Sequence, residues 1–247
     1  MPRWLVLGFQ DRGSPAIVEL FCLHDYVMVI ILRVIVLITY IVIYLLFGFY
    51  YYKFLSEGTF IETIWSLVPA FLLILLLLPS IKVLYIVEDT KFPIFSFKIV
   101  AHQWYWTYIV PLFKNFSYII NSHENSFYEF DSLIESVFNT PRLLRSSSDL
   151  FLPLFVSSRL LISSTDVIHS FSLPSLGLKV DALPGRINQL FCSPLLLGSF
   201  FGQCSEICGS NHSFMPIRVK VCNLKEFDEL RKFYFFDLVE ELFSVNF

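Results

Sequence analysis

The chain has 247 residues, of which 55% are hydrophobic, and its mean hydropathy is +0.65. This composition is too apolar for an ordinary soluble protein, so it predicts a membrane anchor. The net charge of -3 is small, and residues 88–222 contain ten acidic and ten basic side chains. We therefore expect no nucleic-acid partner, because there is no excess of positive charge.

Two apolar runs, at about residues 26–52 and 63–87, dominate the first part of the chain. Each is long enough to cross a bilayer of roughly 30 Å as a helix. We expect residues 1–90 to form an N-terminal segment, without a cleaved leader, and a transmembrane helical hairpin. Arg33 lies about 10 Å inside the first run, where a charge is expected to snorkel outward or face a partner helix.

Thr59 and Glu62 stand where the second helix is expected to begin. A Thr followed three residues later by Glu is the pattern of a capping box, in which the two residues satisfy each other's backbone N–H groups. This structural role alone would account for Glu62.

From residue 91 the sequence changes to short runs rich in Phe, Tyr, Val and Ile, separated by clusters of Pro, Gly, Asn and Ser. This pattern is typical of an all-β sandwich or barrel with Greek-key connections. Leu224 to Phe243 returns to a helical pattern. We therefore expect residues 91–247 to form one β domain with a C-terminal helical tail.

The segment from His102 to Trp106 reads as part of one strand. Alternation along that strand would place Trp104 and Trp106 on the same face as His102, and Tyr105 on the opposite face. Core packing is an adequate explanation of such aromatic residues.

The segment from Cys204 to Met215 contains two thiols, a carboxylate, an imidazole and a thioether, at Cys204, Glu206, Cys208, His212 and Met215. Thiolate and thioether sulfur select copper over hard cations, so this density of soft ligands favours copper. His169 could bring a second imidazole to the same place.

Three other interpretations remain open on the ligand types alone. A zinc site would use Cys204, Cys208 and two imidazoles but would leave Met215 unused. A disulfide between the two cysteines is possible in a loop. A single-copper site needs only one cysteine. The other three thiols, Cys22, Cys192 and Cys222, are expected to be inert.

Several motifs together resemble cytochrome c oxidase subunit II of the mitochondrial type. They are LGFQDxxSP at residues 7–15, HD at 24–25, ETIW at 62–65, HQWYW at 102–106, DVIHSF at 166–171, PSLGLKVDALPGRINQ at 174–189 and GQCSEICGSNHSFMPI at 202–217. The resemblance covers residues 7–222. It implies a cupredoxin-like fold for the β domain.

The resemblance also implies a dinuclear copper centre, CuA, and a role for each ligand. The copper ligands would be His169, Cys204, Glu206 through its carbonyl, Cys208, His212 and Met215. The carboxylate of Glu206 would bind a magnesium ion shared with subunit I. Trp104 would be the point of electron entry, and Glu62 would lie at the entrance of a proton pathway.

The implied function is that of an oxidase subunit in the mitochondrial inner membrane. It would accept electrons from cytochrome c in the intermembrane space and pass them to haem in subunit I, where oxygen is reduced to water and protons are pumped. The partners would be subunit I, other oxidase subunits, cytochrome c and inner-membrane lipids. The rivals are a copper-free quinol oxidase subunit II and a non-catalytic membrane anchor or copper-binding protein.

The chain departs from the family where the acidic docking surface for cytochrome c is expected. Ile109, Arg145 and Ser147 stand where acidic residues are common in the family, whereas Asp131 and Asp166 remain. We therefore expect docking at Asp131 and Asp166 with weakened electrostatic steering.

Overall fold

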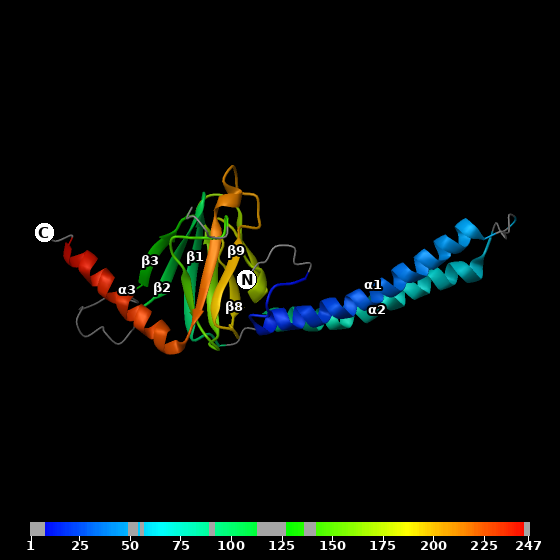
Figure 1. Ribbon diagram of the computed structural model, residues 1–247, viewed down its shortest axis with the longest axis horizontal. Coiled ribbons are helices and arrows are strands. Elements are labelled where there is room, and N and C mark those ends of the chain that lie inside the picture. Colours follow the sequence, from blue (N-terminus) through cyan, green and yellow to red (C-terminus); the bar gives the residue numbers. More distant parts are fainter. Residues whose placement is uncertain are drawn as a thin grey trace. The chain divides into compact units, whose positions relative to one another are not determined.

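The computed structural model describes residues 8–48, 54, 57–88, 92–112, 127–135 and 142–244. These residues form two compact units, a helical hairpin over residues 19–87 and a β unit (Figure 1). Residues 8–18 belong to the β unit, not to the hairpin. The Gly13 amide donates to the Ser175 carbonyl over 2.9 Å, and the Leu195 amide donates to the Gly13 carbonyl over 2.8 Å.

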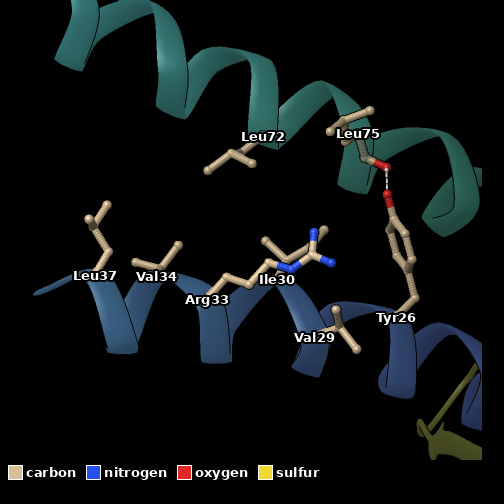
Figure 2. Close-up of a pocket in the computed structure, with 8 residues that line it drawn as sticks. All are labelled: Tyr26, Val29, Ile30, Arg33, Val34, Leu37, Leu72 and Leu75. Carbon is tan, nitrogen blue, oxygen red and sulfur yellow. Dashed lines mark hydrogen bonds between the residues drawn. The ribbon is translucent and has the colours of Figure 1, made fainter. Parts of the chain in front are cut away.

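The hairpin contains α1 (Pro15–Phe47) from residue 19 onward and α2 (Thr59–Glu88) up to residue 87. Both helices are long and apolar enough to cross a membrane, as expected for a two-helix hairpin, and they begin before residues 26 and 63, where the predicted spans begin. Residues 49–52 of the expected first span lie outside the described residues. The Tyr26 hydroxyl donates to the Leu75 carbonyl over 3.3 Å, as Figure 2 shows.

The predicted capping box at the start of α2 is not formed. The Glu62 amide donates to the Gly58 carbonyl over 3.0 Å, and the Thr63 hydroxyl donates to the Thr59 carbonyl over 2.8 Å. Thr59 is therefore the first helical residue, not the residue that caps the helix. The Glu62 carboxylate lies in the first turn, where negative charge interacts favourably with the helix dipole.

The β unit contains ten strands among its described residues. They are β1 (Phe95–His102), β2 (Tyr105–Pro111), β3 (Phe127–Ser132), β4 (Leu150–Pro153), β5 (Ser158–Ser164), β6 (His169–Leu173), β7 (Leu178–Ala182), β8 (Asn188–Cys192), β9 (Gly198–Gln203) and β10 (Pro216–Cys222). A five-stranded sheet has the order β3-β2-β1-β5-β8, a three-stranded sheet has the order β4-β10-β9, and β6 pairs with β7. The strands therefore form the expected β sandwich.

The strand sequences alternate because one face of each sheet is buried. In β5, Leu160 and Ile162 are fully buried while their neighbours Arg159 and Leu161 are not. Strand β6 is buried along its whole length, from His169 onward. Strand β6 therefore lies in the core, and its first residue, His169, is a predicted metal ligand.

The prediction of a single strand through residues 102–106 is wrong. Strands β1 and β2 are antiparallel, with His102 opposite Tyr105 and Ala101 opposite Trp106, so the chain reverses at Gln103 and Trp104. The His102 and Tyr105 rings stack, with centroids 4.6 Å apart. The sequence contains no Gly, Pro, Asn or Asp at the reversal, so the usual turn signal is missing.

The C-terminal helix, α3 (Leu224–Ser244), packs against the β unit (Figure 1). Phe227 is buried, and the Arg231 guanidinium lies 4.9 Å from the centre of the Phe95 ring. Arg231 also donates to the Pro111 carbonyl over 3.0 Å, and the Tyr234 ring stacks on Tyr128. These contacts fix the helix to the edge of the sandwich that carries β3.

We predict that Gly202→Ala destabilises the β unit. A Cβ atom at Gly202 would overlap the Ser172 carbonyl oxygen of the neighbouring strand. Because backbone cannot move aside cheaply, we expect a loss of about 1–3 kcal/mol or more in the free energy of unfolding. The measurement is denaturant unfolding. The control is Gly8→Ala, whose Cβ would meet nothing within 4 Å; equal stability of the two variants would contradict the prediction.

Candidate metal centre

The predicted soft ligands converge from three elements at one end of the sandwich. His169 begins β6, Cys204 and Cys208 lie in the loop that follows β9, and His212 begins the short 3-10 helix η3 (His212–Phe214). Met215 immediately precedes β10. Because β9 and β10 are antiparallel neighbours, the loop between them returns to its starting point and brings its ligands together.

The two thiol sulfurs form the middle of the cluster. The Sγ atoms of Cys204 and Cys208 are 4.0 Å apart. The His169 Nδ1 atom lies 4.0 Å from the Cys204 sulfur, and the His212 Nδ1 atom lies 3.6 Å from the Cys208 sulfur. Each thiol therefore has an imidazole beside it.

A thioether and a carbonyl complete the set of donors. The Met215 Sδ atom lies 3.5 Å from the Cys208 sulfur, and the Glu206 carbonyl oxygen lies 3.3 Å from the Cys204 sulfur. The Glu206 side chain is exposed. The main chain of Glu206 therefore faces the cluster, and its carboxylate is left available for another ligand.

The geometry weighs against the two simplest alternatives. The cysteines are free, and their sulfurs are about twice as far apart as the roughly 2.05 Å of a disulfide bond. A metal–thiolate bond of about 2.3 Å lets one ion touch both sulfurs across 4.0 Å. A zinc tetrahedron would leave the buried Met215 thioether without a role, whereas copper accepts it. The donor set therefore fits copper.

The two thiols differ in acidity. Burial raises the pKa of Cys204, but hydrogen bonds from His169 and from backbone amides outweigh burial and lower the pKa to about 7. Burial and the neighbouring charge of Cys204 raise the pKa of Cys208 to about 12. The pair therefore loses one proton readily, and a bound cation is needed to hold both groups as thiolates near neutral pH.

Asp166 orients one imidazole. Its Oδ1 atom lies 2.9 Å from the His169 Nε2 atom, and its Oδ2 atom accepts a 2.6 Å hydrogen bond from the Gln103 amide. With a proton on Nε2, the His169 Nδ1 atom presents its lone pair to the cluster. Burial opposes ionisation of Asp166, but the hydrogen bonds from His169 and backbone amides hold its pKa below the usual value.

Trp106 lies in the core beneath the metal ligands and contacts both the ligand loop and His169. It is fully buried, and its indole N–H donates to the Met215 carbonyl over 3.4 Å. Its ring also meets the His169 ring edge to face, with centroids 6.1 Å apart. Sequence reasoning assigned Trp106 only to the core and missed this role. Its position opposite Ala101 could be predicted only after the chain reversal was known.

The chain reversal between β1 and β2 brings Trp104 to the ligand loop. The Gln103 side-chain amide donates to the Cys208 carbonyl over 2.8 Å. A Cβ atom at Gly209 would lie 3.1 Å from the half-buried Trp104 ring, so the indole lies directly against the backbone after Cys208. The glycine permits this close approach.

The other predicted residues lie apart from the cluster. Asp131 is exposed on β3 and accepts a 2.7 Å hydrogen bond from the Thr107 hydroxyl. Glu62 belongs to the hairpin. Burial raises the pKa of Cys192 to about 12 and is the main reason that the pKa of Cys222 is raised to about 11. These raised pKa values are expected for inert thiols. Cys22 is exposed.

Comparisons with known proteins match nearly the whole chain to one family. Residues 95–222 match the periplasmic domain of cytochrome c oxidase subunit II, and residues 2–83 match its transmembrane domain. The chain belongs to the cytochrome c oxidase subunit II family. The ligand cluster of His169, Cys204, Cys208 and Met215 is consistent with the CuA site of such a subunit.

Individual relatives match most of the length of the chain, and a solved structure matches the β unit. The cytochrome c oxidase subunit 2 of Yponomeuta malinellus is 40% identical over 92% of this chain and 96% of the relative. That of Acheta domesticus is 42% identical over the same shares. The crystal structure of the periplasmic domain of subunit II from Bradyrhizobium japonicum matches with a TM-score of 0.52 and 36% identity, covering 59% of this chain and 96% of that chain. The cupredoxin-like fold predicted from the sequence is thereby confirmed.

We predict that Asp166→Asn weakens copper binding by about 10–100-fold, because the amide does not fix the His169 tautomer as the carboxylate does. The measurement is competition for copper with a chelator of known affinity. Asp131→Asn is the matched control, since Asp131 pairs only with Thr107 among the described hydrogen bonds. Equal affinities of the two variants would show that Asp166 does not position the ligand.

Proposed function

We propose that this subunit holds a dinuclear copper centre, accepts electrons from reduced cytochrome c and passes them to haem in subunit I. The observation that carries the proposal is the pair of thiol sulfurs 4.0 Å apart, each with an imidazole beside it. A single-copper site uses one cysteine and two histidines. Two cysteines between two histidines favour two metal ions that share the thiolates.

Two copper ions bridged by thiolates would spread the charge of one electron over both ions, so that little rearrangement accompanies electron transfer. The protein contributes rigidity to this chemistry. Asp166 fixes the His169 ring, Trp106 holds the Met215 carbonyl, and Gln103 holds the Cys208 carbonyl. Ligands that are held before an electron arrives do not have to move when it does.

We propose Trp104 as the point of electron entry. Its ring lies close to Gly209, the neighbour of Cys208, because a Cβ atom built there would be 3.1 Å from the ring. Buried indole N–H groups usually find an acceptor, but the Trp104 N–H has none within the described part of the chain. The position of the ring against the ligand loop is the observation that supports the proposal.

The remaining assignments concern the assembled complex. We propose that the exposed Glu206 carboxylate binds a magnesium ion shared with subunit I, because the carbonyl of the same residue faces the copper ligands. Glu62, exposed at the start of α2, is proposed to lie at a proton entrance. We place the subunit in the mitochondrial inner membrane among its lipids, with the β unit in the intermembrane space and other oxidase subunits as partners.

We propose that cytochrome c docks mainly through apolar contacts near the centre, with Asp131 and Asp166 supplying the remaining charge. Ile207 is 83% exposed and Phe214 is 44% exposed. Two carboxylates of the β unit are paired internally: Glu135 with Arg145 at 2.8 Å, and Asp149 with Arg218 at 3.1 Å. These pairs reduce the negative field that would attract a basic partner.

We expect metal analysis of the purified chain to find two copper ions per chain, with an electron paramagnetic resonance spectrum of one unpaired electron shared between them. Cys204→Ser should abolish the shared spectrum, because a hydroxyl is a poor bridging ligand for copper. Met215→Leu should keep both ions and alter the spectrum, since a thioether is a weak ligand.

Other metal contents distinguish the rivals. No copper would favour a quinol oxidase subunit, one copper would favour a copper-binding anchor, and stoichiometric zinc would contradict the copper assignment. Cys192→Ser is the control substitution, because this buried thiol lies outside the ligand cluster.

We predict that turnover with cytochrome c depends weakly on salt. Screening at high ionic strength suppresses attraction between exposed charges, and residues 88–222 carry balanced charge. The measurement is the steady-state rate against ionic strength. Arg145→Glu should make the dependence steeper by restoring an acidic residue, and a steep dependence in the unmodified protein would contradict weak steering.

A further inference from the structure

Arg33 is a charged residue within a membrane-spanning helix. His24 and Asp25 are the last ionisable residues before the apolar run that begins at Tyr26. An ionised Asp25 belongs to the headgroup layer, so Tyr26 lies near the edge of the hydrocarbon. Arg33 is seven residues further along α1, which is about 10 Å by helical rise.

The Arg33 side chain faces a cavity between the two helices. The cavity has a volume of about 370 Å³, and its walls are aliphatic apart from Arg33 and Tyr26. Figure 2 shows the guanidinium between α1 and α2, extended from its own turn toward Tyr26. This direction brings the charge closer to the headgroup layer than the Arg33 backbone is.

The described part of the hairpin offers no partner of opposite charge to Arg33. The Tyr26 hydroxyl donates its proton to the Leu75 carbonyl. A charged arginine inside a membrane helix is unfavourable unless it is paired, so an anion from outside the hairpin would stabilise it.

We propose that the cavity binds a phospholipid, whose phosphate pairs with Arg33 and whose acyl chain lies along the aliphatic wall. Guanidinium has the planar fork that binds phosphate oxygens in pairs. Val34, Leu37 and Leu72 form the aliphatic wall. The ligand is therefore an amphipathic anion with its charged group toward the Tyr26 end.

A protein helix fits this space less well than a lipid. A helix with its side chains is about 10–12 Å across, and the cavity lies between two helices of the same chain. An acyl chain is much thinner and can enter from the bilayer. The carboxylate of a neighbouring subunit's side chain is the competing source of negative charge.

The test uses the assembled oxidase and a phosphatidylglycerol with a photoreactive acyl chain. Labelling should map to residues 26–37 or 72–75. Arg33→Leu should reduce labelling about tenfold, the effect of losing one charged hydrogen-bonded contact, while Arg33→Lys should retain part of it. Leu72→Trp should also reduce labelling, by filling the cavity while leaving the charge in place.

The control is Leu45→Trp, a residue on α1 that does not line the cavity, and its labelling should equal that of the unmodified oxidase. If Arg33→Leu does not assemble, Leu72→Trp carries the test. The proposal is overturned if both variants keep full labelling. It is also overturned if Arg33→Leu still assembles as an oxidase but lacks one particular neighbouring subunit, because the counter-charge is then a carboxylate of that subunit. Neither outcome depends on the copper content.

Discussion

The β unit is organised around the separation of two thiols, Cys204 and Cys208, on a loop between two antiparallel strands. A loop of this length would be mobile on its own, yet the two sulfurs lie close enough for one ion to touch both. The distance of 4.0 Å between them is maintained by contacts outside the loop. Trp106 and Gln103 lie on β2 and in the chain reversal before it, and they donate hydrogen bonds to the Met215 and Cys208 carbonyls. The five-stranded sheet therefore positions the ligand loop between β9 and β10 of the three-stranded sheet.

The same arrangement explains how far the sequence could predict the site. The ligand types and their spacing from Cys204 to Met215 favoured copper over hard cations, because thiolate and thioether sulfur are soft donors, but they left zinc, a disulfide and a single-copper site open. The partners of these ligands could not be predicted, since Asp166 and Trp106 act through contacts between strands that are distant in the sequence. The sequence predicted Asp166 only as a docking residue, but its carboxylate also fixes the orientation of the His169 ring.

The errors in the fold have local physical causes. Residues 102–106 look like one strand because aromatic residues continue through the reversal and no typical turn residue marks it. Thr59 looked like a cap because the pattern matched, but the Gly58 carbonyl already accepts the Glu62 amide. The two spans and the β class were predictable because hydrophobic length and alternation are properties of whole segments, and single residues do not alter them.

Charge is sparse around the candidate metal centre and also in the hairpin. The consequences differ because the first lies in water and the second in the hydrocarbon of the bilayer. Around the candidate metal centre the charged side chains lie in water, where a lost ion pair costs little. In the hairpin, Arg33 lies in hydrocarbon, where an unpaired charge is expensive. The β unit can therefore lose acidic residues with modest effect, whereas an anion beside Arg33 would stabilise the hairpin.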